Sequence, residues 1–500
     1  MSRKSKAILP VALAIAMILG IVLGRGLRQP ESSMKSSDWE KIDQILHYVE
    51  SDYVDEVSRT ELEEDAIVYL LQRLDPHSHY ISQDELAAVN EPLQGSFQGI
   101  GVQFNLNGDT VYIINTIDGG PSEKAGIKAG DKLIAVEDQI IAGVGITNTD
   151  VMKLLKGESG TQVHVSLLRN REKLEKTITR GEVALPSIDA AYTMDDTIIY
   201  IKLNRFSQNT FNEFKDRVYP LKTGASKHFI LDLRGNGGGL LDVASDIADE
   251  FLEDGKLITY TEGKSRPRTE FYATSQGEFE AVNLYLIING YSASASEIIA
   301  GAMQDHKRAT IYGKQSFGKG LVQEQNEWAD GSATRLTVAR YYTPNGRSIQ
   351  REYESISNLG SIDSLTGDPR GGIRPDVEVL RDTAGITWLF AEMVHRGLIS
   401  NFVYEFRDKH SDSLQQIGLA GFNTLAMDST LIEQFGLYAA EQKLEIDSTE
   451  WRRSQGLIVH RLKALMVRNV FSEQDYIKVQ NQMDPAIRAI LNDIKTPTAL

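Results

Sequence analysis

The sequence predicts a multidomain protein of the α+β and α/β classes: a helical N-terminal segment, a compact β-rich module, an α/β layer and a helical tail. The 500 residues, 41% of them hydrophobic, exceed what a single core usually organises. The apolar pattern also changes along the chain, from helical spacing to Gly-punctuated alternation, then to strands alternating with helices, and finally back to helical spacing. We therefore expect several successive domains.

The first segment has the pattern of a membrane anchor. Three basic residues precede an uncharged run from Ala7 to Gly24, which is just long enough to span a bilayer. A cleaved signal peptide would begin in the same way, but no clear small-x-small cleavage site precedes the polar residues 28–37. We therefore expect residues 1–30 to be an uncleaved single-pass anchor in the inner (cytoplasmic) membrane, with the rest of the chain in the periplasm or otherwise outside the cytoplasm.

The next four segments differ in their apolar pattern. Residues 31–94 carry two apolar sets at helical spacing, and residues 95–183 alternate in β fashion, as in TVYIINTI and QVHVSLLR, with a short helix expected near residues 150–155. Residues 184–380 alternate strands such as IIYIKL, HFILDL and LYLIIN with helical stretches such as SEIIAGAMQD. This alternation is typical of an α/β layer with crossover helices. Residues 381–500 are amphipathic and helix-like.

Composition excludes several classes of function. The net charge of −16 and the lack of a Lys/Arg-rich cluster argue against nucleic-acid binding, which needs a basic face. The chain has no cysteine, which excludes a thiol nucleophile, a Cys-ligated zinc ion and any disulfide. We expect neither a metal nor a cofactor.

Ser294 is the first candidate for chemistry. In NGYSASASEIIAGAMQDH, residues 289–306, a strand ends and a helix begins, and Glu297 follows Ser294 by three residues as in a capping box. The plain interpretation is an N-cap. The functional interpretation is a nucleophile, because unpaired N–H groups at a helix N-terminus, such as that of Ala295, stabilise a developing oxyanion.

Lys319 is the second candidate. The stretch YGKQSFGKG, residues 312–320, is nearly a phosphate-binding loop, but Gly320 stands where Ser or Thr would hold Mg²⁺, and LVQEQNEW continues like a strand. No histidine has a context that suits a base for Ser294, so Lys319 could serve if its pKa falls by several units from about 10.4. Most lysines are simply solvated, and that alternative stays open here.

The stretch LDLRGNGGGLLDVA turns from a strand to a helix through three consecutive glycines at residues 237–239. Backbone N–H groups in such a turn can approach a ligand closely. A tight turn with no ligand explains the pattern equally well.

Taken in order, these stretches resemble a known family. GIGVQF with PSEKAGIKAGDKLIAV is similar to a PDZ domain. LDLRGNGGGLL, SASASEIIAGAMQD, SFGKGLVQ and RYYTPNGRSIQ are similar to the core of the C-terminal processing peptidases, or tail-specific proteases, over roughly residues 40–380. The resemblance implies a crotonase-like α/β protease core. It also implies protein substrates with free, mostly apolar C-termini, cleaved near those ends outside the cytoplasm.

The resemblance also implies roles for ten residues. Ser294 would be the nucleophile, Lys319 the general base and Gln323 the group that orients the lysine, since an amide carbonyl accepts a hydrogen bond without adding charge. Oxyanion N–H groups would come from Ala295, Gly238 and Gly239. The loop that binds the substrate carboxylate would be Gly99, Ile100, Gly101 and Val102.

Two parts of the chain depart from the family pattern: an apparent insertion at residues 351–371 and the helical tail. The tail could mediate homodimerisation or adaptor docking, or simply pack against the core. Two other functions compete with proteolysis. A non-catalytic PDZ adaptor on a protease scaffold is disfavoured by the intact set of Ser294, Lys319 and Gln323, and a crotonase-like acyl enzyme would bind coenzyme A.

Overall fold

The computed structural model describes residues 40–169, 171–351, 371–380, 383, 385–407, 409–410, 419 and 429–496. The predicted anchor and nearly all of the apparent insertion lie outside these residues. Within them, no helix is both long and apolar enough to cross a bilayer. The chain divides into two compact units, Met1–Tyr80 and Ile81–Leu500, and the short strand β1 (His79–Ile81) spans their boundary.

The first unit contains the two predicted helices, α2 (Glu40–Asp52) and α3 (Arg59–Gln72). Arg59 joins them, because its guanidinium lies 2.5 Å from Asp43 on α2 and 2.8 Å from Glu63 on its own helix. Much of the periodic apolar set nevertheless stays exposed. The helical prediction is therefore confirmed, although these residues do not form a closed core within this unit; among the exposed ones are Ile42, Ile45, Ile67, Leu70 and Leu74.

The second unit begins with α4 (Gln83–Gln94) and the β-rich module. Antiparallel strands form a sheet of order β3-β4-β5-β7-β8, with β6 on β5, and β2 pairs separately with β9. Alternate residues of β7, such as Val163 and Val165, point into the core, as expected for a sheet with one buried face. The elements are β2 (Ser96–Gly99), β3 (Val102–Asn107), β4 (Thr110–Thr116), α5 (Pro121–Lys124), β5 (Lys132–Val136), β6 (Gln139–Ile140), α6 (Asn148–Leu155), β7 (Gln162–Arg169), β8 (Glu172–Thr179) and β9 (Gly181–Ala184).

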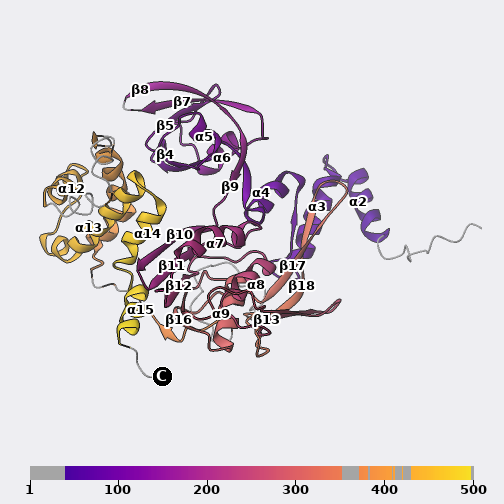
Figure 1. Cartoon of the computed structure of the whole chain (residues 1–500). Coiled ribbons are helices and arrows are strands. Elements are labelled where there is room, and N and C mark those ends of the chain that lie inside the picture. Colours follow the sequence, from indigo (N-terminus) through magenta and orange to yellow (C-terminus); the bar gives the residue numbers. More distant parts are fainter. Residues whose placement is uncertain are drawn as a thin grey trace, which may run out of the picture. The chain divides into compact units, whose positions relative to one another are not determined.

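The α/β layer is built on a six-stranded sheet of order β10-β11-β12-β15-β16-β19, shown edge-on in Figure 1. The strands from β11 to β19 run parallel, and β10 is an antiparallel edge strand. Helices cross over between the parallel strands, which confirms the predicted α/β class. The elements are β10 (Ile188–Asp195), β11 (Ile198–Leu203), α7 (Thr210–Val218), the 3₁₀ turn Tyr219–Leu221, β12 (His228–Asp232), α8 (Leu241–Asp249), β15 (Asn283–Ile288), α9 (Ala295–Asp305), β16 (Ala309–Gly313) and β19 (Val377–Glu378).

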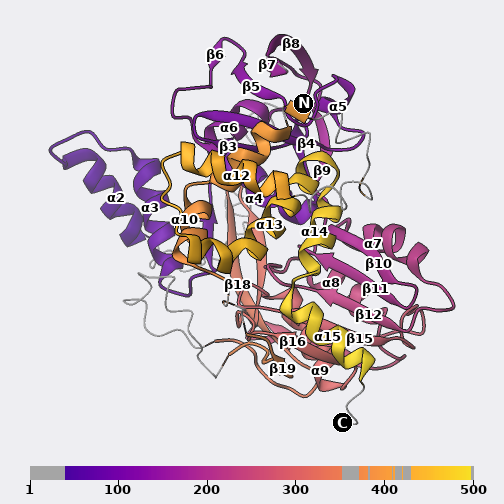
Figure 2. The ribbon, with the colours of Figure 1, turned by 90° about the vertical axis from the view of Figure 1, so that its left-hand side faces the viewer.

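The two faces of this sheet are both buried, because successive residues of a strand point to opposite sides. Ile199 and Ile201 of β11 belong to the core that α7, α8 and α9 cover, whereas Ile198 and Tyr200 belong to a second core. That second core is closed by α14 (Glu473–Asn481) and α15 (Pro485–Lys495) from the end of the chain (Figure 2). The last two helices of the tail therefore complete the α/β layer.

Strands β13, β14, β17 and β18 belong to a second sheet beside the layer, in which β13 pairs with β14 and β18, and β17 pairs with β18. The rest of the tail forms its own apolar core from α10 (Trp388–His395), α12 (Ser429–Glu441) and α13 (Ser448–Val470). The strands are β13 (Leu257–Gly263), β14 (Arg266–Tyr272), β17 (Leu321–Glu327) and β18 (Ala333–Tyr342).

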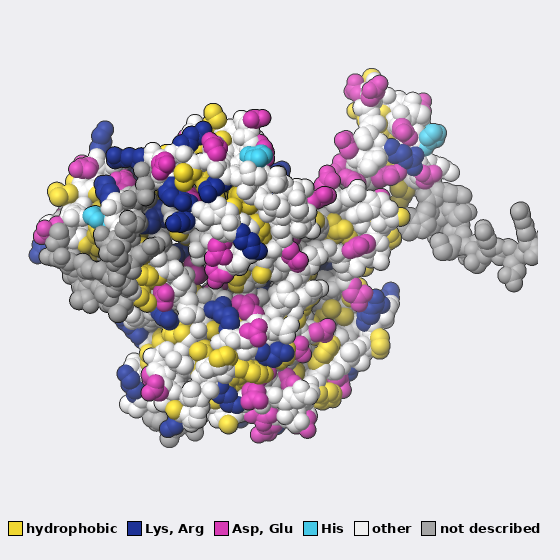
Figure 3. Space-filling view, turned by 45° about the horizontal axis from the view of Figure 1, so that its top comes forward, with side chains coloured by type: hydrophobic (Ala, Val, Ile, Leu, Met, Phe, Trp, Pro, Cys, Tyr) yellow, Lys and Arg dark blue, Asp and Glu magenta, His cyan; other side chains and the backbone are white. Residues whose placement is uncertain are grey.

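The surface mixes charges of both signs. On the face drawn in Figure 3, Lys and Arg side chains are interspersed with Asp and Glu among the described residues. No extended face of one sign stands out in this view, in keeping with the lack of a Lys/Arg-rich cluster in the sequence.

Candidate active site

Ser294 precedes α9, a few residues after β15 ends, with a backbone that few non-glycine residues adopt. Its φ of 55° and ψ of −115° lie outside the main allowed regions. The two neighbouring serines have structural roles, since Ser292 Oγ donates to the Leu233 carbonyl at 2.8 Å and Ser296 Oγ to the Asn236 carbonyl at 3.0 Å. Strain of this kind is found at functional positions that the surrounding structure holds in place.

The glycine turn after β12 lies directly against Ser294. A Cβ added to Gly238 would lie 2.7 Å from the Ser294 Cβ, and one added to Gly239 would lie 2.0 Å from the Phe206 carbonyl oxygen. Both glycines also have φ values in the left-handed half of the map, 100° and 146°. Only glycine fits at these two positions, so the turn permits a close approach that any side chain would block.

Two of the three predicted oxyanion donors, Gly238 and Ala295, differ in their hydrogen bonding. The Gly238 N–H already donates to Asn236 Oδ1 at 2.9 Å. Ala295 is the first residue of α9, so its N–H has no acceptor within the helix. The Ala295 N–H is thus placed at the positive end of the helix dipole.

Lys319 lies beside Gln323, just before β17 begins. Its Nζ donates to Gln323 Oε1 at 2.8 Å, and the lysine side chain is half-buried. Ser294, Lys319 and Gln323 line the same pocket of about 360 Å³, together with the glycine turn. The structure therefore brings the three predicted catalytic residues together. The pocket is otherwise largely apolar, with Leu93, Leu240, Leu241, Ile298, Leu321 and Val322 in its walls.

Glu297 is the centre of the network behind this pocket. Its Oε2 accepts from the N–H groups of Ser294 (2.8 Å) and Lys319 (2.9 Å), and its Oε1 accepts from the Ser316 hydroxyl (2.5 Å) and the Gly318 N–H (2.7 Å). The side chain is fully buried, and this burial raises the pKa of Glu297 to about 7, although the four hydrogen bonds lower it. One carboxyl group thus connects the segments that carry Ser294 and Lys319.

Tyr341 forms a second connection between the two segments. Its hydroxyl lies 3.1 Å from the Ser294 carbonyl oxygen and within hydrogen-bonding distance of the Lys319 carbonyl oxygen. The ring is 2% exposed, and burial raises the pKa of this phenol well above its usual value. Tyr341 therefore remains a neutral donor at any ordinary pH.

The local sequence pattern indicated the roles of Glu297 and Tyr341 only in part. The capping-box spacing pointed to the bond from Ser294 N–H to Glu297, but not to Lys319 or Gly318, which lie more than twenty residues away. RYYTPNGRSIQ marked the position of Tyr341 without indicating a role. Both roles depend on contacts between distant segments, which local spacing does not encode.

The β-rich module places its predicted loop between β2 and β3. The Ile100 carbonyl accepts from the Ser122 N–H at 2.9 Å, and the Gly101 carbonyl accepts from the Ile117 N–H at 3.0 Å. In a trans peptide the C=O of one residue and the N–H of the next point in opposite directions. The N–H groups of Gly101 and Val102 therefore point away from these interior partners.

The loop leads into β3, a strand with one edge unpaired in its sheet among the described strands. β3 is the terminal strand of its sheet among the described strands, and it pairs only with β4 in that sheet. Helix α6 lies close by, since a Cβ added to Gly99 would lie 3.5 Å from the Leu155 carbonyl oxygen. An extended peptide could add to β3 with its end at the loop.

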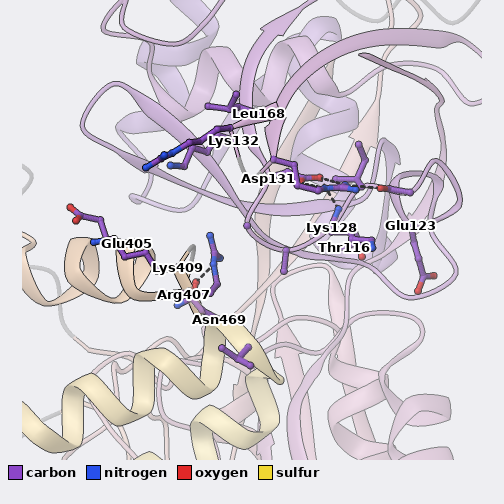
Figure 4. A pocket seen from close by; sticks show the side chains of 17 residues that line it. Thr116, Glu123, Lys128, Asp131, Lys132, Leu168, Glu405, Arg407, Lys409 and Asn469 are labelled. Carbon is purple, nitrogen blue, oxygen red and sulfur yellow. Dashed lines mark hydrogen bonds and ion pairs between the residues drawn. The ribbon is translucent and has the colours of Figure 1, made fainter. Parts of the chain in front are cut away.

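A larger pocket of about 980 Å³ lies between the β-rich module and the tail helices (Figure 4). Its lining includes six basic and three acidic side chains, and one of the acids, Asp131, is paired with Arg169 at 2.6 Å. No described residue of its lining is a serine. Among the described residues, no group of three or more His, Asp or Glu side chains is arranged to hold a metal ion.

Comparisons with known proteins identify relatives of this chain. Residues 197–379 match peptidase family S41, residues 98–179 match the PDZ domain, and residues 389–472 match a family of unknown function. A carboxy-terminal-processing protease of Bartonella bacilliformis is 35% identical over 312 residues, which are 61% of this chain and 71% of that protein. A probable CtpA-like serine protease of Staphylococcus aureus is 31% identical over 340 residues, or 67% of this chain and 68% of that protein. Among solved structures, the photosystem II D1 C-terminal processing protease is 28% identical and covers 69% of this chain and 88% of its own, with a TM-score of 0.40.

Proposed function

The chain belongs to peptidase family S41 and is a serine-type, C-terminal processing peptidase with a PDZ domain, and from this premise we propose that Ser294 and Lys319 act as its catalytic dyad. The observation that carries the proposal is their meeting in one pocket beside the glycine turn, with Lys319 Nζ bonded to Gln323. The adaptor and coenzyme A alternatives give no reason for this meeting.

The proposed reaction uses neutral Lys319 as a base. Ser294 Oγ attacks the scissile carbonyl carbon while its proton passes to Lys319 Nζ, which Gln323 Oε1 keeps oriented. The carbonyl oxygen becomes an oxyanion, and the C–N bond then breaks as the lysine ammonium returns the proton to the leaving amine. Water, deprotonated by Lys319, next attacks the acyl-serine ester. The ester C–Oγ bond then breaks, Ser294 Oγ takes the proton back from Lys319, and the acid is released.

We assign the oxyanion first to the N–H groups of Ala295 and Gly239. Preorganised backbone donors are suited to this charge, and the Ala295 N–H also lies at the N-terminus of α9. The Gly238 N–H is bonded to Asn236 Oδ1, so it joins them only if that bond is released. Gly238 still contributes by allowing the turn to approach Ser294.

We propose that the PDZ domain holds the free C-terminus of the substrate. The outward N–H groups of Gly101 and Val102 would bind the carboxylate, while Gly99 and Ile100 shape the loop and β3 pairs with the peptide backbone. Gly101→Ala should weaken binding of a fluorescent apolar C-terminal peptide at least about tenfold, because φ is 73° and a Cβ would crowd Val183 at 3.2 Å. The same peptide with an amidated C-terminus is the control, and equal binding of the two peptides by the parent protein would contradict the assignment.

Residues 7–24 are the basis for our proposal that the protein is anchored in the cytoplasmic membrane and acts on exported proteins. Fractionation of cells that produce the full chain, followed by protease treatment of intact spheroplasts, tests this. Digestion of the catalytic part from outside is expected, and protection would overturn it.

The dyad is tested with the full chain and an unfolded protein that ends in a free apolar C-terminus. Product masses are compared for the parent, Ser294→Ala, Lys319→Ala and the control Lys314→Ala, which removes an exposed lysine from the same segment. We expect both dyad variants to lose at least about a thousandfold in kcat/KM, and Lys314→Ala to retain activity. Full activity of either dyad variant would refute the mechanism, and binding without cleavage by all four proteins would favour the adaptor.

A further inference from the structure

The catalytic pocket contains a second basic side chain that the mechanism does not use. Arg335 of β18 lines the pocket together with Ser294, Lys319 and Gln323. Of the residues described as lining it, only Lys319 and Arg335 are charged, and none is acidic. The pocket therefore offers positive charge to whatever part of the substrate lies beside Arg335.

The strand register fixes where this charge lies relative to the dyad. Gln323 of β17 is opposite Thr337, and Gln325 is opposite Arg335. Residues two apart on a strand face the same side and are about 7 Å apart. Gln323 holds Lys319, and Arg335 lies two strand residues farther along the sheet than the residue opposite Gln323. This displacement equals the length of about two residues of an extended substrate.

Arg335 is held by neutral groups. Its Nη2 donates to Gln325 Oε1 at 2.8 Å and to Asn90 Oδ1 of α4 at 3.4 Å, and both acceptors are amide oxygens. Partial burial lowers the pKa of its guanidinium, and no described carboxylate acts in the opposite direction. A partly desolvated cation with only neutral acceptors gains from an incoming anion, and the fork of a guanidinium matches a carboxylate in geometry.

We propose that Arg335 binds a carboxylate of the substrate about two residues from the scissile bond and thereby selects where the chain is cut. The inference rests on the proposed peptidase function of the pocket. The carboxylate can belong to a Glu or Asp side chain of the substrate or to its own C-terminus, because the chemistry is the same. In the first case Arg335 selects an internal site, and in the second it sets the length of the piece removed.

The proposal gives Arg335 and the PDZ loop different tasks. A carboxylate held by Gly101 and Val102 cannot occupy the catalytic pocket at the same time. The PDZ loop would recruit the chain by its end, whereas Arg335 would read the segment that enters the pocket. Apolar walls of the same pocket, such as Leu93, strengthen this ion pair because they exclude water.

The experiment uses fluorogenic peptides of one sequence in two arms. In the first arm all peptides have an amidated C-terminus, and Glu or Gln stands two residues from the cut on either side. In the second arm that position is Gln, and the C-terminus, two residues after the cut, is a free acid or an amide. The proteins are the full-length parent, Arg335→Gln and the matched control Arg340→Gln, which removes an exposed arginine of the same strand.

The readout is the ratio of kcat/KM for the carboxylate peptide to that for its neutral twin. We expect this ratio to be about tenfold to a hundredfold in the parent in at least one arm, as for a charge-assisted hydrogen bond, mainly through KM. It should fall to about one in Arg335→Gln and stay at the parent value in Arg340→Gln. Because both peptides meet the same protein, a general loss of folded enzyme cancels from the ratio. A ratio near one in the parent in both arms, or an unchanged ratio in Arg335→Gln, would overturn the proposal.

A binding measurement separates this inference from the proposed function. The same peptides are bound to Ser294→Ala and to Ser294→Ala with Arg335→Gln, and anisotropy is recorded. Cleavage that survives Ser294→Ala defeats the dyad, whereas preferential binding of the carboxylate peptide that disappears with Arg335→Gln still supports the inference. Equal binding of both peptides to Ser294→Ala refutes the inference even if the parent cleaves them.

Discussion

Glu297 gives the sharpest test of how the active site is held together. The substitution Glu297→Gln keeps the size of the side chain but removes its charge and turns one acceptor oxygen into a donor. Since each carboxylate oxygen accepts two hydrogen bonds, the amide nitrogen must face either the N–H groups of Ser294 and Lys319 or the pair from Ser316 and Gly318. The Ser316 hydroxyl can itself accept, so we expect the amide to turn that way and leave the Gly318 N–H unpaired.

The magnitude follows from two opposing effects. An unpaired buried donor costs about 1–3 kcal/mol, whereas the substitution also removes the cost of burying a charge. A pKa raised from 4.5 to about 7 corresponds to about 3 kcal/mol. A carboxyl group whose pKa is higher in the folded state than in the unfolded state stabilises the fold while it is protonated. This stabilisation is fully present below pH 4.5 and is lost as the pH rises through about 7. Gln has no such dependence, so the advantage of the parent over the variant should shrink by about 3 kcal/mol between pH 4.5 and pH 8.

Two assays follow from this. Hydrogen exchange of the Gly318 and Lys319 amides measures the local opening free energy at both pH values, after correction for intrinsic exchange. The pH profile of kcat/KM measures function: when Glu297 takes up a proton, its donors lose an acceptor, so parent activity should fall as the pH drops through about 7. Glu297→Gln should lack this midpoint and be about 10- to 100-fold less active above it, which matches one displaced hydrogen bond.

The control is Glu262→Gln, which neutralises an exposed carboxylate on β13. It should shift neither the exchange nor the profile. If the difference in opening free energy between the parent and Glu297→Gln were the same at both pH values, ionisation of Glu297 in the fold would be refuted. If Glu297→Gln retained the parent profile, its role in positioning Ser294 and Lys319 would be refuted.

Two further predictions concern the glycine turn and its anchor. Gly238→Ala should lower kcat/KM at least about a hundredfold, because the new Cβ meets the Ser294 Cβ at 2.7 Å. The control Gly237→Ala places its Cβ in open space and should be nearly neutral. Equal activities of the two variants in the cleavage assay would contradict this prediction. Arg234→Gln leaves the fully buried Asp232 without its bidentate partner at 2.6 Å and should cost about 3–5 kcal/mol, read from the urea midpoint and from hydrogen exchange in β12. Arg234 and Lys202 hold the pKa of Asp232 well below its usual range, so the parent loses this stabilisation as the pH falls below the ordinary carboxyl range. A loss of unfolding free energy under about 1 kcal/mol in Arg234→Gln would refute the argument.

Much of the fold could be predicted because each element has a local signature. Strand β7 alternates buried and exposed residues, and helix α9 begins after a serine with Glu three residues on. The second buried face of the α/β sheet could not be predicted from local pattern. The residues that cover this face lie in α14 and α15, nearly two hundred residues beyond β15. An amphipathic pattern predicts that a helix buries one face, but not which surface that face packs against. The same limit applies to α2 and α3, whose apolar spacing predicted the helices but not the exposure of Ile42 and Leu70.

Some residues of the site could likewise be predicted from the sequence and others could not. The difference depends on whether the contacts of each residue are local or join distant segments. Gly238 and Gly239 were visible in the sequence because their positive φ values are a local requirement of the turn, whereas their close approach to Ser294 and Phe206 is not local. Glu297 was half visible, because the capping bond is local, whereas its bonds to Gly318 and Lys319 exist only after β17 and α9 have come together. A buried carboxylate that binds donors from two distant segments can form only when both segments are in place. The meeting of the segments that carry Ser294 and Lys319 is therefore coupled to folding of the core. Burial raises the pKa of Glu297 and its four hydrogen bonds lower it, so this carboxyl group responds to the same packing that brings the two segments together.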